Sequence, residues 1–248
     1  MDVHLLGTAG YHPNEQRHTA CMMIPEAGLV FDAGTAFFRV RDLAQTPDLH
    51  LFLTHCHLDH CVGLSFFIDT MHETVVENIY VYGLPEKLAA VRQHLFSEHL
   101  FPVNPPFHWI EIAAGQKLDV ALGGKLKTFP LKHPGGSLGI RVDWPDHTLA
   151  YVTDTTADLQ ADYVDEIRGV DLLLHECHFP DGLETLAADS GHSCLTPVAQ
   201  VSRAADAQLT VLVHINPLAT DDPPLDLDSV KSINENILLG QDKMVVKL

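Results

Sequence analysis

The sequence predicts an α/β fold in a single domain that spans residues 1–248. Apolar runs rich in β-branched and aromatic residues alternate along the chain with segments that carry helix start signals. No linker interrupts this alternation, and an apolar content of 46% suffices for a large core. Several of the apolar runs end in histidine or aspartate. We therefore expect polar side chains to gather at the rim of a sheet.

The first half of the chain is predicted to begin with strands, after which strands and helices alternate. A hairpin is expected around Pro25 and Gly28, which separate two apolar runs, and Thr35 is expected to cap a helix. Pro85 stands where proline is favoured, in the first turn of a helix. The predicted strands are 3–6, 20–24, 29–31, 51–53 and 78–83, and the predicted helices are 35–43, 60–70 and 84–96.

The second half is predicted to contain short strands separated by glycine turns, followed by alternating elements. Thr196 is expected to cap a helix that has Pro197 in its first turn. The predicted strands are 109–112, 126–132, 138–142, 149–153, 170–175, 209–213 and 244–248, and the predicted helices are 162–168, 195–207 and 227–239.

Residues 55–60, with the sequence HCHLDH, directly follow a predicted strand. His55 and His57 are two residues apart, so on an extended backbone they point to the same side and can bind one metal ion. Asp59 and His60 follow after the chain turns, and they are expected to face a second ion. Imidazole and carboxylate ligands favour zinc first and then manganese or iron. The alternative is that this segment is a histidine-rich surface loop. The chain has 17 histidines, so some of them must cluster by chance.

This segment resembles the HxHxDH signature of the metallo-β-lactamase superfamily. The resemblance implies a four-layer αββα sandwich with a hydrolytic site for two divalent ions. Three more candidate ligands each end an apolar run, and Asp32 is expected to brace the metal loop from behind. By resemblance, His55, His57 and His133 would hold one ion, Asp59, His60 and His214 would hold the other, and Asp154 would bridge the two.

Two ions so held would share a bridging water and lower its pKa enough to supply hydroxide at neutral pH. By the same resemblance, Asp59 is expected to serve catalysis as well as metal binding. Two divalent cations, less two carboxylates and one hydroxide, leave a local charge of about +1, which favours a small anionic substrate.

Two further stretches narrow the resemblance to the ribonuclease Z-like group. Residues 174–179 (LHECHF) and 191–194 (GHSC) resemble its HEAT-F and GHST stretches. The resemblance implies that Glu176 orients His192, and that His192 stabilises the scissile phosphate or protonates the departing oxygen. Alternatively, His192 is a structural residue in a loop that caps a helix. His175 and His178 have no place in the implied ligand set, so a structural role is expected for both.

The substrate is expected to be a small or cyclic phosphodiester. Enzymes of this group that process transfer RNA carry a long arm after the bridging aspartate, whereas only residues 155–174 are found here, so transfer RNA is not the expected substrate. A lactonase or another ester hydrolase of the same superfamily is an open alternative. So is a metal-binding accessory protein without turnover, because one in this superfamily has a similar histidine-isoleucine-asparagine stretch near its end, here residues 214–216.

Charge and cysteine usage bear on partners and compartment. A net charge of −18 argues against a general nucleic-acid binder. Five cysteines without a CxxC pair, no basic leader and no long apolar segment predict a cytoplasmic protein that does not enter membranes. Dimers are common among members of the resembled family, so a homodimer is one state to be expected.

The segment 120–142 is basic in an acidic chain, because its four basic residues occur without any acidic residue. Two interpretations stay open for this segment. It is either a solvated strand face, which is the simpler interpretation, or a surface that grips phosphates flanking the reaction centre. The four residues are Lys125, Lys127, Lys132 and Arg141.

Overall fold

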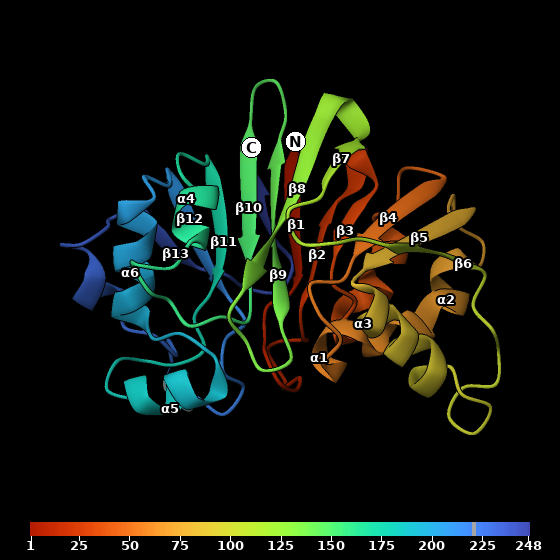
Figure 1. Ribbon diagram of the computed structural model, residues 1–248, viewed down its shortest axis with the longest axis horizontal. Helices are drawn as coiled ribbons and strands as arrows, with labels where there is room; N and C mark the ends of the chain where they lie inside the picture. The colour runs from red at the N-terminus through yellow and green to blue at the C-terminus, as the bar shows by residue number, and fades with distance from the viewer. Residues whose placement is uncertain (220–221) are drawn as a thin grey trace. The chain divides into compact units, whose positions relative to one another are not determined.

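The computed structural model describes residues 1–219 and 222–248, and it contains two compact units (Figure 1). Unit 1 comprises residues 1–113 and 241–247, and unit 2 comprises residues 114–240 and Leu248. Each unit contains one seven-stranded sheet that is antiparallel at one side and parallel at the other. The division into units does not test whether the chain is one domain, which stays a prediction.

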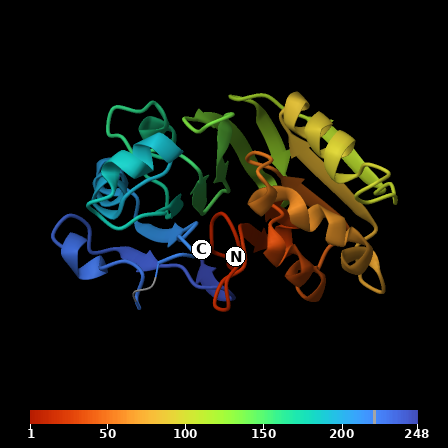
Figure 2. The same ribbon diagram turned by 90° about the horizontal axis from the view of Figure 1, so that it is seen from below.

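The sheet of unit 1 has the strand order β14-β1-β2-β3-β4-β5-β6. Strands β14 to β3 are antiparallel neighbours, and β3 to β6 are parallel. Because β14 pairs with β1, the two ends of the chain lie close together, as the marks N and C show in Figure 2. The bounds are β1 Asp2–Gly7, β2 Cys21–Ile24, β3 Leu29–Phe31, β4 Asp48–Phe52, β5 Asn78–Gly83, β6 Phe107–Glu111 and β14 Met244–Lys247.

Short helices join the strands of unit 1 and bury their apolar side chains against its sheet. Phe37, Leu64 and Phe67 belong to one core cluster together with Leu51 and Val81 of the strands. Helix α3 has Pro85 in its first turn, as predicted, and it contacts β5 and β6. The helices are α1 Leu58–Cys61, α2 Phe67–Met71 and α3 Pro85–Ala90, the 3-10 helices are η1 Pro25–Ala27, η2 Thr35–Asp42 and η3 Val62–Phe66, and η4 Val91–Leu95 is a π-helix.

The sheet of unit 2 has the strand order β13-β12-β11-β10-β9-β8-β7. Strands β7 to β10 are antiparallel neighbours, and β10 to β13 are parallel. Every residue of β11 is buried, as expected for a parallel strand inside a sheet that is covered on both faces. The bounds are β7 Lys117–Val120, β8 Gly124–Leu131, β9 Ser137–Asp143, β10 Thr148–Val152, β11 Leu172–Glu176, β12 Leu209–Val213 and β13 Ile237–Leu239.

The helices of unit 2 complete its core. Val201 of α6 packs with Val152 and Leu173 of the strands, and Val198 packs with Leu212. Figure 1 shows α4 and α6 beside β11 and β12. The helices are α4 Tyr163–Glu166, α5 Glu184–Ser190 and α6 Leu195–Ala204, with the 3-10 helices η5 Ala121–Gly123 and η6 Leu227–Val230. In the part of the chain that the structure describes, no helix is both long and apolar enough to cross a bilayer.

Several sequence predictions of secondary structure are wrong. Residues 227–239 were expected to be one helix, but they form η6 and then β13. Hydrogen bonding explains the difference: β13 completes the sheet beside β12, and Asn234 donates to Ser202 Oγ. The predicted helix 60–70 is divided into α1, η3 and α2. Strand β7 and helix α5 were not predicted at all.

The two predicted threonine caps are wrong as well. Thr35 does not cap η2, and its hydroxyl instead accepts a hydrogen bond from Thr19 N at 2.9 Å. Thr196 lies inside α6, and its N–H and hydroxyl both donate to the carboxylate of Asp181. The start of α6 is therefore held by a carboxylate that lies 15 residues earlier in the chain, which no local pattern predicts.

Gly63 is expected to be essential for the packing that holds the metal loop. A Cβ atom there would lie 2.2 Å from Gly34 O and 2.6 Å from Phe37 Cβ. Gly63→Ala should therefore lower the free energy of unfolding by about 1–3 kcal/mol in chemical denaturation. The matched control is Gly83→Ala, whose Cβ would meet the end of the flexible Leu88 side chain at 3.0 Å. Equal stabilities of the two variants would contradict this account.

Candidate metal centre and catalytic residues

The metal loop of unit 1 is anchored to its sheet by Asp32, which is completely buried. Asp32 follows β3 and adopts a left-handed backbone with φ of 59°. Thr54, two residues after the end of β4, donates to Asp32 Oδ1 from its N–H at 2.8 Å and from its hydroxyl at 3.0 Å. A buried carboxylate that accepts several hydrogen bonds fixes the position of the backbone leading into residues 55–60.

The same carboxylate orients His60. Asp32 Oδ2 lies 2.9 Å from His60 Nδ1, and both side chains are fully buried. A carboxylate at Nδ1 keeps the proton there, so Nε2 presents its lone pair as a ligand. This arrangement agrees with the bracing role expected of Asp32.

The other ligand candidates of unit 1 lie around His60. The ring of His55 lies 4.2 Å from that of His60 and 4.5 Å from that of His57, between centroids. Asp59 Oδ2 lies 3.5 Å from His60 Nε2 and accepts a hydrogen bond from Tyr11 N at 2.7 Å. Three imidazoles and a carboxylate within one loop match the donor set that zinc, manganese or iron accept.

Asp32→Asn is expected to weaken metal binding about 10–100-fold, because an amide cannot hold the proton on His60 Nδ1 as a carboxylate does. The measurement is competition for zinc against a chelator of known affinity. Asp69→Asn, at an exposed acid of α2 in the same unit, is the matched control. Unchanged affinity in Asp32→Asn would contradict the role of Asp32.

In unit 2, Asp154 lies between two histidines. Asp154 Oδ2 is 3.5 Å from His133 Nε2, and Asp154 Oδ1 is 3.3 Å from His214 Nε2. Each oxygen therefore faces a different imidazole, which is the arrangement required of a carboxylate that bridges two ions. Asp154 and His214 follow β10 and β12 with φ of 53° and 56°. Left-handed backbone is uncommon outside glycine and often marks functional positions.

The surroundings of His133 favour its neutral form. Its Nδ1 lies 3.0 Å from Gly191 O, which as an acceptor places the proton on Nδ1 and the lone pair on Nε2. Burial lowers the pKa of His133, although Asp154 and the Gly191 carbonyl act in the opposite direction. A lowered pKa keeps the imidazole unprotonated at neutral pH, as metal binding requires.

Glu176 lies within hydrogen-bonding distance of His192, the residue that the resemblance implies it orients. Glu176 ends β11 and is fully buried, and its Oε1 lies 3.0 Å from His192 Nδ1. Its carboxylate also accepts from Thr155 N at 2.7 Å and from Ser193 N at 3.1 Å. Burial alone would raise the pKa of Glu176, but the charge and hydrogen bond of His192 act in the opposite direction, and the net shift is downward. Glu176 is therefore an ionised anchor for His192.

His178 is the site residue that the sequence interpretation missed. Its ring stacks on His192, with centroids 4.6 Å apart and planes at 22°, and its Nδ1 lies 3.1 Å from His214 O. Burial, with the neighbouring His214 and His192, lowers the pKa of His178 to about 4. Strand alternation was the available signal, since residues 176 and 178 share one side of an extended chain. His175, by contrast, is structural as expected: it is buried and bonds Tyr163 Oη at 3.1 Å.

The basic segment of unit 2 is compensated by acids from outside it. Lys127 pairs with Glu166, Lys125 with Asp119, and Arg141 with Asp143. These ion pairs favour the interpretation as a solvated strand face over that of a phosphate grip. Lys132 is exposed at the end of β8.

Known proteins resemble this chain along almost its whole length. Residues 28–215 match the family model described as "Beta-lactamase superfamily domain". Ribonuclease Z of Archaeoglobus fulgidus is 24% identical over 299 aligned positions, which cover 98% of this chain and 96% of the relative. A metallo-beta-lactamase fold protein of Bacillus subtilis, YhfI, has a TM-score of 0.79 at 18% identity, with 99% of each chain covered. The short form of human tRNase Z has a TM-score of 0.78 at 21% identity, covering 100% of this chain and 99% of the other.

These similarities establish both the fold and the family. The structural match to YhfI extends over both sheets, so the chain has the metallo-β-lactamase α/β sandwich fold. The family model covers well over half of the chain, and it includes all of the candidate ligands, Glu176 and His192. The chain therefore belongs to the metallo-β-lactamase superfamily, in its ribonuclease Z-like branch, and is a metal-dependent hydrolase.

Proposed function

We propose that this protein is a dinuclear phosphodiesterase that acts on a small or cyclic phosphodiester. The observation that carries the proposal is the pair of Glu176 and His192, in which a buried carboxylate lies 3.0 Å from one ring nitrogen of a histidine. Hydrolysis of an ester with a poor leaving group needs a proton donor, and a histidine held in this way is suited to be one. The family resemblance assigns the same role to these two residues.

The proposed ligands are those that the family resemblance implies. His55, His57 and His133 would hold one ion, Asp59, His60 and His214 the other, and Asp154 would bridge them. The donor chemistry supports this set, because His60 and His133 each have Nδ1 engaged by an oxygen and so present Nε2. When bound, the two ions, zinc by preference, would activate a water for attack and offset the charge of the phosphate. Asp59 serves catalysis through its place in this set.

His192 would protonate the departing oxygen from Nε2. Its side chain is 14% exposed, so a substrate can reach it, whereas Glu176 is closed to solvent. The ionised Glu176 stabilises the imidazolium form of His192 before transfer and keeps its ring in one orientation afterwards. His178, neutral at pH 7 and stacked on the same ring, limits the rotation of His192 without adding charge.

We propose a small substrate because the described fold has no protruding arm after Asp154. Between Asp154 and β11 the described fold has only α4, which is no protruding arm. The alignment with the Archaeoglobus ribonuclease Z extends over 299 positions, more than the 248 residues of this chain, so the relative has segments without a counterpart here. A net charge of −18 also disfavours a long polyanion. The five free cysteines support a cytoplasmic setting.

A substrate panel tests the proposal. Metal-replete protein would be assayed with bis(p-nitrophenyl) phosphate, a 2′,3′-cyclic nucleotide, a precursor transfer RNA, an acyl-homoserine lactone and a thioester. We expect turnover of the small phosphodiesters and none of the precursor. Lactone turnover without phosphodiester hydrolysis would refute the proposal, and no turnover at all would favour a metal-binding accessory protein. Efficient processing of the precursor would refute the small-substrate part alone.

A further inference from the structure

Strand β7 ends the sheet of unit 2 and leaves one of its edges open to pairing. Thr128 N donates to Gln116 O at the start of the β7–β8 pair, and hydrogen-bonded positions alternate along an antiparallel ladder. Leu118 therefore turns its main-chain groups toward β8, opposite Leu126. Lys117 and Asp119 turn theirs to the open edge.

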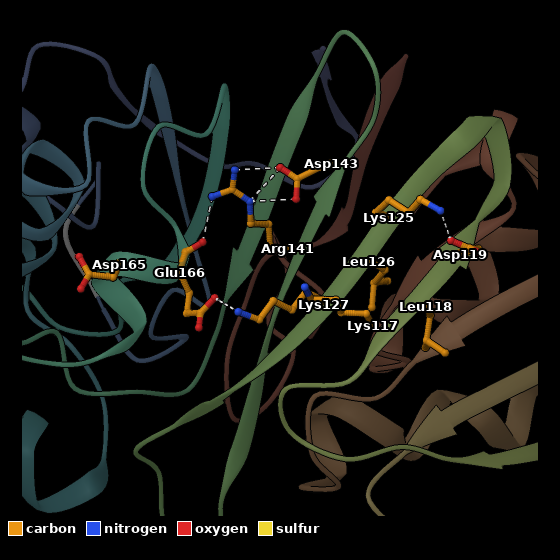
Figure 3. A pocket seen from close by; sticks show the side chains of 10 residues that line it. All are labelled: Lys117, Leu118, Asp119, Lys125, Leu126, Lys127, Arg141, Asp143, Asp165 and Glu166. Atoms are coloured by element: carbon orange, nitrogen blue, oxygen red, sulfur yellow. Dashed lines mark hydrogen bonds and ion pairs between the residues drawn. The ribbon is translucent and has the colours of Figure 1, made fainter.

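The side chains at and next to this edge form two rows of charge across the sheet (Figure 3). They line a hollow of about 660 Å³. Cross-strand register places Lys117, Lys127 and Arg141 in one row. The next row holds Asp119, Lys125 and Asp143. The first row is thus wholly basic, and the second ends at the edge with an acid.

Ion pairs within unit 2 compensate most of the basic row. Lys127 pairs with Glu166 and Arg141 with Asp143. Over residues 1–219 and 222–248, Lys117 makes no ion pair, although it lies at the open end of the row. Like charges directly opposite each other on neighbouring strands are unfavourable, so an acid beside Lys117 would stabilise this edge.

We propose that a second copy of this chain supplies that acid, and that two copies pair through antiparallel β7 strands about a two-fold axis at Leu118. In this register Lys117 lies opposite Asp119 of the second copy, and the reverse pair forms by symmetry. Both residues turn their main-chain groups outward, so each such pair is also a hydrogen-bonded pair. A lysine on an edge strand usually blocks pairing with another strand. Here Asp119, two residues after Lys117, favours the one register in which the two charges of opposite sign face each other.

The pairing joins the two sheets of unit 2 into one continuous sheet. Because β7 has only four residues, the dimer is expected to be weak and dependent on concentration. The inference does not depend on the proposed function, since it involves neither the metal loop nor His192.

Sedimentation of the full-length protein from micromolar to millimolar concentration tests the pairing. Lys117→Asp and Asp119→Lys each place like charges opposite one another in the homodimer, and each should raise the dissociation constant at least tenfold. An equimolar mixture of the two variants places opposite charges at every pair and should restore dimers. Asp146→Lys, in the exposed turn between β9 and β10, is the control for the change in net charge, and circular dichroism checks that each variant is folded.

Three results would overturn the proposal. They are a wild-type protein that stays monomeric at the highest concentration, single variants that dimerise as the wild type does, and a mixture that dimerises no better than either variant alone.

Discussion

His192→Ala is expected to lower the kcat for a small phosphodiester by roughly 10²–10⁴-fold while the metal content stays unchanged. The variant removes the proposed proton donor but none of the proposed ligands. The buried Glu176 keeps its two backbone donors, Thr155 N and Ser193 N, so the loop does not lose its anchor. Steady-state kinetics and elemental analysis of the same preparation give the two quantities.

The control for this variant is His147→Ala, which removes a partly exposed histidine from the turn before β10. It should leave both kcat and metal content as they are. A further comparison uses substrates with leaving groups of different pKa. Loss of a proton donor slows esters with poor leaving groups most, whereas p-nitrophenolate departs without help. Loss of metal in His192→Ala, or an equal loss of rate for all leaving groups, would refute the role assigned to His192.

Asp154→Ala is expected to abolish activity by removing the one carboxylate proposed to contact both ions. Metal binding should fall with it, and this effect can be measured without any substrate. A ligand present at about 100 times its dissociation constant stabilises a protein by about 2.7 kcal/mol, so added zinc should raise the melting temperature of the wild type and not that of the variant. Elemental analysis after dialysis gives the number of ions retained.

Asp158→Ala is the matched control, because Asp158 is an exposed acid four residues further along the same connection. It should keep the response to zinc. Two ions retained by Asp154→Ala would contradict the bridging assignment, and one ion retained would show that the two sets of ligands bind independently.

Local patterns of the sequence predicted the chemistry that we propose for this protein. The spacing of His55, His57, Asp59 and His60 after an apolar run predicted the metal loop, because strand alternation and the following turn are local properties. The positions of three more candidate ligands were predicted in the same way, because each of them follows a single apolar run that was recognised as a strand. These residues are His133, Asp154 and His214. Together with residues 174–179 and 191–194, these patterns also carried the family resemblance, which the family model confirmed.

Only the tertiary structure decided features that depend on partners distant in sequence. The apolar spacing of residues 227–239 fits a helix, yet β13 forms because β12 offers an edge to pair with. Asp181 replaces the expected threonine as the anchor of α6. His178 follows β11 and contacts His192, which lies between α5 and α6, and His214, which follows β12. Hydrophobic periodicity describes a segment's own surface, whereas these outcomes depend on hydrogen bonds and burial supplied by other segments.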